Sequence, residues 1–211
     1  MQKIDSSILA IIFDLGGVLL NIDFSLTQKA FADMGMEHPE KLFGQYAQAG
    51  FFDSLDKGQI GEIKLYDELR SRIPQPVSDE EARAAWNAMI LDFPRKRLDL
   101  LIKLKNKYRL FLLSNTNEIH YNLYNKQIQD MGFDSLEFFF EKSYFSFRDQ
   151  RRKPDAEYFL KVLKENNLIP SKTLFLDDSS NNISAAEQLG ILTVEVTEEL
   201  DITEILADMR V

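Results

Sequence analysis

Four short runs of apolar residues, each followed by polar or turn residues, predict the strands of a parallel sheet. They occupy residues 9–13, 110–113, 173–176 and 192–196. Helical periodicity separates them, over 97–108, 156–167 and 182–190. Alternation of strands and helices predicts an α/β fold with a doubly wound, Rossmann-like parallel sheet. Ligands of such sheets bind at the carboxyl ends of the strands.

The stretch from about 21 to 94 has a different pattern, because it shows helical periodicity and no convincing strand. Its four helical segments read FSLTQKAFADMG, PEKLFGQYAQAG, IGEIKLYDELRSR and SDEEARAAWNAMI. We therefore predict a small all-helical cap over 21–94, inserted after the first strand of a core formed by 1–20 and 95–211. The segment LEFFFEKSYFSF (136–147) has room for one or two further strands.

Composition narrows the function classes. The chain has 211 residues, 45% of them hydrophobic, and a net charge of −9, which disfavours nucleic acid and anionic membranes as partners. It has no cysteine, which excludes disulfides and thiolate chemistry and is compatible with a reducing compartment. The apolar run Ile8–Phe13 is too short for a signal peptide, and no stretch is long enough to cross a bilayer. We expect a cytoplasmic protein that binds a small molecule; its oligomeric state stays open, with a monomer plausible.

Polar residues follow the predicted strands at the point where each strand ends. Because the carboxyl ends of parallel strands meet at one edge, these side chains are expected to converge. The set consists of Asp14, Ser114, Asn115, Thr116, Asp177 and Asp178, with the loop RRKPD (151–155) nearby. Taken singly, each has an ordinary reading as a cap, turn or solvated surface, and only their order and spacing favour a site.

Phosphoryl transfer would explain this set. Clustered carboxylates repel one another, and a bound Mg²⁺ relieves the repulsion through oxygen ligands. Gly16 and Gly17 allow the backbone to approach an ion or phosphate closely. Ser114 can donate to a phosphoryl oxygen, and Lys153 adds a positive charge. An aspartate such as Asp14 can itself be the nucleophile and form an aspartyl-phosphate.

The motifs FDLGGV, LLSNT, RRKPD and LFLDDSSNN, together with the helical insertion, resemble the haloacid dehalogenase-like hydrolase superfamily. The resemblance covers about residues 8 to 196. The chain is most similar to the bacterial branch that includes α-D-glucose-1-phosphate phosphatase, which also carries Asp-Leu-Gly in the first motif. The resemblance implies an α/β core with a helical cap and a Mg²⁺-dependent phosphatase activity.

The resemblance also implies roles for individual residues. Asp14 would be the nucleophile and a metal ligand. The Gly16 carbonyl and Asp178 would complete the protein's metal ligands, with Asp177 assigned to the outer shell. The phosphoryl group would be held by Ser114, Asn115 and Lys153.

Two positions depart from the pattern of the superfamily. Gly16 stands where most of its phosphatases carry a second aspartate, the general acid and base, and Gln150 stands where relatives often have glycine. The missing acid could be replaced by water or by Asp23, Asp177 or His120. The substrate could also need little help, as an anomeric sugar phosphate does, and we favour this last explanation with assistance from water.

The leading hypothesis is a Mg²⁺-dependent phosphatase of small phosphorylated metabolites, with sugar phosphates preferred, that acts through an aspartyl-phosphate. One alternative is a non-catalytic phospho-ligand-binding or scaffold protein, and another is a phosphomutase or phosphotransferase. In the cap, Trp86 and the phenylalanines of GFFDSL are expected to be core, although part of FFDSLDKGQ could face the substrate. The run RKR (95–97) is expected to be a solvated face.

Overall fold

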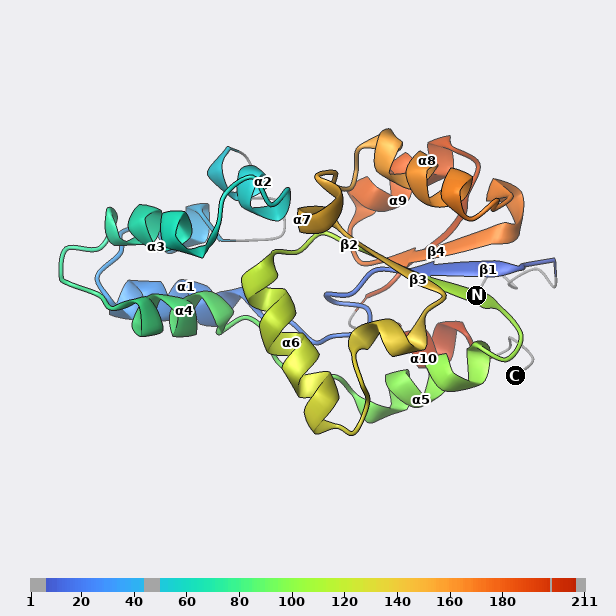
Figure 1. Cartoon of the computed structure of the whole chain (residues 1–211), viewed down its shortest axis with the longest axis horizontal. Helices are drawn as coiled ribbons and strands as arrows, with labels where there is room; N and C mark the ends of the chain where they lie inside the picture. Colours follow the sequence, from blue (N-terminus) through green and yellow to red (C-terminus); the bar gives the residue numbers. More distant parts are fainter. Residues whose placement is uncertain (1–6, 44–49, 198, 208–211) are drawn as a thin grey trace.

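The computed structural model describes residues 7–43, 50–197 and 199–207, and its α/β part is built on a five-stranded sheet (Figure 1). All neighbouring strands are parallel, in the order β3-β2-β1-β4-β5. The strands are β1 (Ala10–Phe13), β2 (Arg109–Ser114), β3 (Lys142–Phe145), β4 (Thr173–Asp177) and β5 (Leu192–Glu195). The predicted fold class and its four strands are confirmed. The segment 136–147 supplies one more strand, β3, between the 3₁₀ turn η2 (Leu136–Phe139) and α7 (Ser146–Asp149).

Helices cover both faces of the sheet (Figure 1). One face carries α5 (Arg95–Leu104), α6 (Glu118–Asp130) and α10 (Ile202–Ile205). The other carries α8 (Ala156–Glu165) and α9 (Ser180–Gln188), with η3 (Pro170–Lys172) before β4. In β1, Ile11 and Phe13 pack into the first core, while Ala10 and Ile12 pack into the second. Burial on both faces explains why the strand is an unbroken apolar run.

The helical segment has a hydrophobic core of its own. Its elements are α1 (Phe24–Asp33), η1 (Pro39–Lys41), α2 (Phe51–Asp56), α3 (Glu62–Arg70) and α4 (Asp79–Asn87). Phe31, Leu65 and Trp86 pack in this core, and Ile119 from α6 joins them. Of the helix predicted over 39–50, the described part contains only the 3₁₀ turn η1, and residues 44–49 lie outside the described residues.

Two linkers join the helical segment to the sheet, and they pair with each other in antiparallel fashion. The amide of Asn21 donates to the Asp92 carbonyl at 2.9 Å, and the amide of Leu91 donates to the Asn21 carbonyl at 3.0 Å. Arg97 braces this junction through an ion pair with Asp201 at 2.8 Å and a hydrogen bond to Asn21 Oδ1 at 2.9 Å. The expectation of a solvated face is therefore wrong for Arg97, whose largely buried side chain links the linker at Asn21 to Asp201 before α10.

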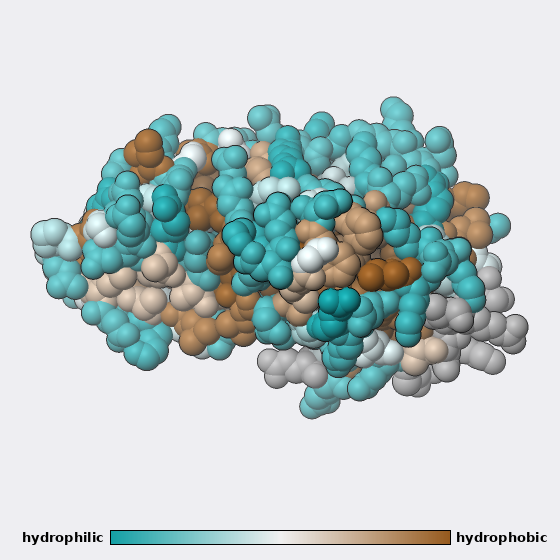
Figure 2. Space-filling view, turned by 60° about the horizontal axis from the view of Figure 1, so that its bottom comes forward, coloured by the Kyte–Doolittle hydropathy of each residue, from teal (hydrophilic) through white to brown (hydrophobic). Residues whose placement is uncertain are grey.

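On the face shown in Figure 2, hydrophilic side chains predominate and hydrophobic ones form separate patches. Within the described ranges, none of the helices combines the length and the apolar character needed to cross a bilayer.

Candidate active site

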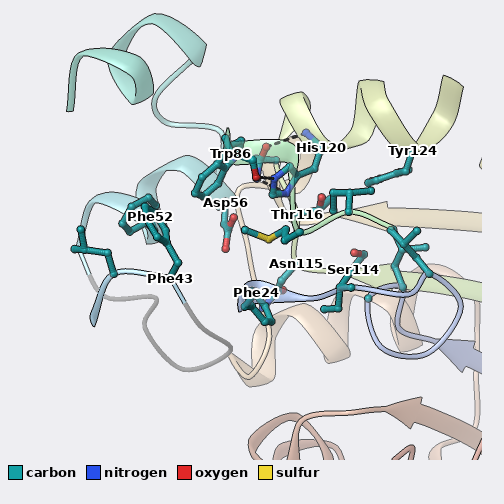
Figure 3. Close-up of a pocket in the computed structure, with 18 residues that line it drawn as sticks. Phe24, Phe43, Phe52, Asp56, Trp86, Ser114, Asn115, Thr116, His120 and Tyr124 are labelled. Carbon is teal, nitrogen blue, oxygen red and sulfur yellow. Dashed lines mark hydrogen bonds between the residues drawn. The ribbon is translucent and has the colours of Figure 1, made fainter. Parts of the chain in front are cut away.

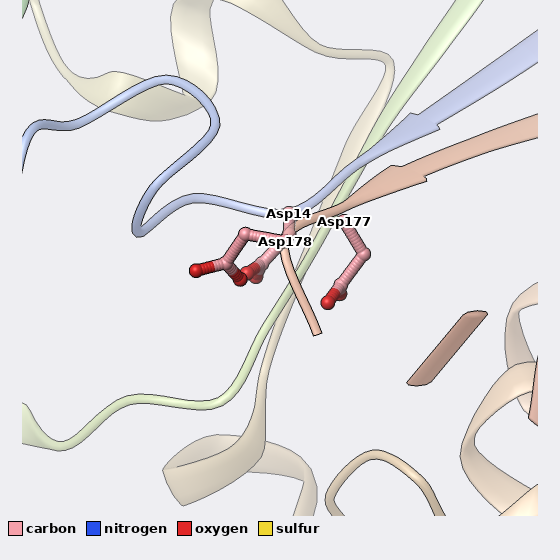
Figure 4. Close-up of side chains that lie close together, drawn as sticks. All are labelled: Asp14, Asp177 and Asp178. Carbon is pink, nitrogen blue, oxygen red and sulfur yellow. The ribbon is translucent and has the colours of Figure 1, made fainter. Parts of the chain in front are cut away.

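The register of the sheet brings the predicted acidic residues to one level. Phe13 lies opposite Leu176, so Asp14 and Asp177 follow at the same edge, and the Asp14 amide donates to the Leu176 carbonyl at 2.8 Å. Figure 4 shows Asp14, Asp177 and Asp178 at the ends of the two strands. Each offers a carboxylate oxygen within 4.8 Å of the other two. The convergence expected from the sequence is present.

Lys153 lies inside this cluster. It is 1% exposed, and its Nζ lies 2.6 Å from Asp14 Oδ1 and 2.6 Å from Asp177 Oδ2. A buried ammonium of this kind is tolerable only with such partners. Burial raises the pKa of Asp14 to about 8, and Asp177 and Asp178 add to the rise while Lys153 opposes it. Asp14 therefore favours a neighbouring cation, which would hold it in its charged form.

The two adjacent aspartates have different surroundings. Asp177 is fully buried: Oδ2 meets Lys153, and Oδ1 accepts from the Ser179 amide and from Asn182 Nδ2, each at 2.9 Å. Asp178 is partly exposed and lines the cavity that also contains Asp14. Both oxygens of Asp177 thus bond within the protein, while Asp178 lines the cavity beside Asp14.

Of the two adjacent glycines, Gly17 is the one at which the structure requires glycine. Its φ is +73°, and a Cβ there would overlap Asp178 Oδ2. Gly16 has no such φ, and a Cβ there would meet only the flexible end of Ile22, with Cδ1 at 3.1 Å. A carboxylate seated against a bare backbone beside two other carboxylates fits a hard divalent cation such as Mg²⁺, which takes oxygen ligands.

Asn115 contributes in a way the sequence does not reveal. Its Nδ2 donates to the Lys153 carbonyl and its Oδ1 accepts from the Lys153 amide, both at 2.8 Å. The side chain therefore fixes the loop that carries the buried lysine, and its backbone N–H is the group left for an anion. Ser114 is 2% exposed and lines the neighbouring cavity with Gly16.

The departure at Gln150 has a simple conformational reading. Gln150 ends α7 in the left-handed region, with φ of 54°. Glycine adopts this conformation without penalty, and glutamine adopts it less readily. The loop thus keeps the backbone path that a glycine would favour, and it delivers Lys153 to the carboxylates.

The three candidate acids named from the sequence are all engaged elsewhere. Asp23 caps α1 by accepting from the Ser25 amide at 2.9 Å. Both carboxylate oxygens of Asp177 are bonded to Lys153, the Ser179 amide and Asn182. His120 is buried and stacks on Trp86, with ring centroids 5.0 Å apart, and its Nε2 lies 3.2 Å from the Trp86 carbonyl.

That contact fixes the state of the His120 ring. A carbonyl only accepts, so Nε2 carries the proton, and Nδ1 accepts from Asn117 Nδ2 at 3.2 Å. Burial lowers the pKa of His120 to about 4. The ring is a neutral contact between α6 and Trp86 of α4.

The segment FFDSLDKGQ, part of which was expected to face the substrate, contributes polar residues whose individual roles the sequence does not reveal. Arg152 is 7% exposed, and its guanidinium lies 3.2 Å from Asp53 Oδ1 and 3.8 Å from Asp56 Oδ2. Asp53 also pairs with Lys57 at 3.0 Å. Asp53, Asp56 and Lys57 are spaced at i, i+3 and i+4, which places them on one face of a helix. This spacing was the signal that the sequence offered.

Comparison with known proteins places the chain in a family. The model of the haloacid dehalogenase-like hydrolases matches residues 8–190. A D-ribitol-5-phosphate phosphatase from Bacteroides thetaiotaomicron is 30% identical over 186 residues, which cover 88% of this chain and 90% of that protein. A sesquiterpene phosphatase from Aspergillus oryzae is 26% identical, with 90% and 91% of the two chains covered.

A solved structure agrees with these sequence matches. A variant of a haloacid dehalogenase family enzyme from Bacteroides thetaiotaomicron, in complex with magnesium and inorganic phosphate, superposes with a TM-score of 0.88. It is 35% identical, and the match covers 94% of this chain and 98% of that one.

Proposed function

Because the chain belongs to the haloacid dehalogenase-like hydrolase family, we propose that it is a Mg²⁺-dependent phosphatase of small phosphorylated metabolites. One observation carries the proposal: Asp14 lies at the end of β1, 2.6 Å from the buried ammonium of Lys153, within a cluster of three aspartates. A protein that only bound a phosphorylated ligand would have little use for a carboxylate aimed at the phosphoryl group.

The residues divide the work as follows. Asp14 attacks the phosphorus atom and forms an aspartyl-phosphate, which water then hydrolyses. Mg²⁺, held by Asp14, Asp178 and the Gly16 carbonyl, supplies neutralisation of phosphoryl charge. Lys153 and the hydroxyl of Ser114 bind the phosphoryl oxygens, and the pairing of Asp177 with Lys153 keeps the ammonium in place.

Asn115 positions this machinery through the backbone of Lys153. The assignment of Asp178 to the metal rests on its place at the cavity, whereas both oxygens of Asp177 have protein partners.

The cap is proposed to select the organic part of the substrate. A cavity next to Asp14 is lined by strand-end residues of the core and by cap residues that include Phe52 and Trp86. These aromatic residues belong to the cap core, as expected, and also border the cavity. The relatives act, by their names, on a polyol phosphate and a sesquiterpene phosphate, so phosphate esters of alcohols are the class to test first.

The proposal is tested by measuring phosphate release from sugar phosphates, ribitol 5-phosphate, an isoprenoid monophosphate and an aryl phosphate, with and without Mg²⁺. We expect Mg²⁺-dependent release that Asp14→Asn abolishes. Release that persists in the Asp14 variant would contradict the proposal. Action on small molecules in the cytoplasm completes the proposed role.

A further inference from the structure

Two adjoining cavities meet at the carboxyl edge of the sheet. One contains Asp14, Lys153 and Asp178, and the other lies between this edge and the cap. They share Gly16 and Asn115 among their lining residues. The phosphoryl group would lie where the two cavities meet, between Lys153 of the first and Ser114 of the second, so the rest of the second is where the organic part of the substrate would lie (Figure 3).

Asp56 introduces a carboxylate into this otherwise largely apolar second cavity. It is the last residue of α2 and is 9% exposed. Among the described residues that line the cavity, it is the only carboxylate, and Figure 3 shows it among Trp86, Thr116 and Asn115. Burial of an acid in such surroundings favours the protonated form.

The charged groups around Asp56 do not cancel its preference for the protonated form. Arg152 approaches it only to 3.8 Å and lies closer to Asp53, at 3.2 Å. Asp53 is in turn shared with Lys57, and His120 across the cavity is neutral. Burial therefore raises the pKa of Asp56 to about 6, with Arg152 opposing the rise and Asp53 adding to it.

The geometry of the reaction places the leaving group on this side. Displacement at phosphorus is roughly in line, so the leaving oxygen departs opposite the attacking Asp14. Among the described residues at the core edge no acid is available there, since Gly16 lacks a side chain and both oxygens of Asp177 are bonded within the protein. An acid for the leaving group must come from the opposite wall, which the cap forms.

We propose that Asp56, delivered by α2 of the cap, is the general acid and base that replaces the carboxylate missing at Gly16. In the first step Asp14 Oδ bonds to phosphorus, the bond from phosphorus to the ester oxygen breaks, and that oxygen takes the proton of Asp56. In the second step the Asp56 carboxylate takes a proton from water, the water oxygen bonds to phosphorus, and the phosphorus–Asp14 bond breaks. This inference rests on the proposed phosphatase function.

The test compares leaving groups. In wild type, kcat/KM across a series of phosphate monoesters should depend weakly on the pKa of the leaving alcohol, because a proton is supplied. Asp56→Asn should lower kcat/KM for primary alkyl phosphates about 10²–10³-fold and for p-nitrophenyl phosphate less than about tenfold, since nitrophenolate leaves without a proton. A steep dependence on leaving-group pKa in wild type would overturn the proposal.

The matched control is Asp53→Asn, on the same helix and paired with the same arginine. Asp53 lines the cavity that contains Asp14 and Lys153 but not the cavity that contains Asp56. The Asp53→Asn variant should therefore lower kcat/KM for alkyl and aryl phosphates by a similar factor. An Asp56→Asn variant that behaves in the same way would reduce Asp56 to a structural role.

A rescue sharpens the result. Gly16→Asp in the Asp56→Asn background places a carboxylate where most relatives carry one. The position has an ordinary φ, and a Cβ there requires only a small shift of the flexible end of Ile22. We expect at least about tenfold recovery on alkyl phosphates with little change on aryl phosphates. Failure of wild type to hydrolyse any phosphate ester, aryl ones included, would instead contradict the phosphatase function itself.

Discussion

Lys153 and Arg152 are neighbours in the chain, yet they serve opposite walls of the active-site cavity. Lys153 lies 2.6 Å from a carboxylate on each side, both belonging to the sheet. Arg152 points to the cap, where it lies 3.2 Å from Asp53 and 3.8 Å from Asp56. The sheet edge thus buries charges that are tightly paired, whereas the cap buries a carboxylate that is loosely paired.

This difference suits two kinds of chemistry. At the sheet edge, Lys153 together with a bound cation would hold the carboxylates in their charged form, and fixed charge is what stabilisation of a phosphoryl group requires. Loose pairing in an apolar cavity brings the pKa of Asp56 to about 6, close to the working pH that a proton donor needs. Substitutions on the two walls should therefore have different signatures.

The largest effect is expected at the centre of the sheet edge. Asp14→Asn removes the nucleophile and one metal ligand, so kcat should fall by about 10³-fold or more on every phosphate ester. The fold should stay intact, because asparagine has the shape of aspartate and Lys153 keeps Asp177 as its partner, as circular dichroism and thermal unfolding can show. Wild-type turnover by the variant would rule out a covalent aspartyl-phosphate.

Lys153→Met should weaken both catalysis and the fold. It leaves Asp14 and Asp177 buried without their shared cation, and breaking a buried pair of this kind costs about 3–5 kcal/mol in the free energy of unfolding. We expect kcat to fall about 10²-fold or more, with a lower urea midpoint. Arg151→Met, an exposed neighbour, is the control and should alter neither quantity much. A stable Lys153→Met protein would show that the ion pairs contribute little.

The adjacent aspartates should separate metal binding from stability. Asp178→Ala should lower the affinity for Mg²⁺ at least about tenfold with little loss of stability, because its carboxylate borders the cavity. Asp177→Ala should chiefly destabilise the fold, because Lys153, the Ser179 amide and Asn182 lose their acceptor. Titration calorimetry and urea unfolding measure the two effects, and the opposite pattern would reverse the assignment of the metal ligand.

The sheet edge could be predicted from the sequence because its residues follow strands. An apolar run such as 9–13 fixes where β1 ends, so Asp14 is placed by position alone, and the parallel register does the same for Asp177. The same edge also shows the limit of prediction from sequence. Asn115 has the expected location, but its side chain bonds to the backbone of Lys153 instead of being available for the phosphoryl group. Hydrogen-bond partners depend on the path of a distant loop, which no local pattern encodes.

The cap could be predicted only as a group of helices. Asp56 ends a six-residue helix, and a lone aspartate in a polar segment usually faces solvent. Its burial depends on how α2 packs beside residues from α4, α6 and the loop at Arg152, which are distant in sequence. The same applies to Arg97, whose partner Asp201 lies 104 residues further along the chain.

The smallest effect on turnover is expected from His120, where pH separates the two buried groups of the cavity. His120→Gln should change kcat only a few-fold, because the proton on Nε2 is held by the Trp86 carbonyl and does not reach the substrate. Its effect should instead be on stability. The pKa of His120 is lowered in the folded protein from 6.5 to about 4, so its contribution is complete above pH 6.5 and is lost as the pH falls toward 4.

The pKa shift of Asp56 has the opposite effect on the pH dependence of stability. Its pKa is raised in the folded protein from 3.8 to about 6, so its contribution is complete below pH 3.8 and is lost as the pH rises toward 6. Each shift corresponds to about 3 kcal/mol, and in wild type the two largely offset each other between pH 4 and 6.5.

The two single variants should therefore differ from wild type in opposite ways in how their stability changes with pH. Relative to wild type, Asp56→Asn should gain stability as the pH rises from 4.5 to 6.5, because the cost of ionising the buried Asp56 is removed. His120→Gln should lose stability relative to wild type over the same interval, because the gain from deprotonating His120 is removed. Urea unfolding at the two pH values measures both, and the double variant is the control, with a pH dependence close to that of wild type. If either single variant followed the wild-type profile, the buried group it removes would not be titrating in this range, and for Asp56 the proton it is proposed to donate would have to come from elsewhere.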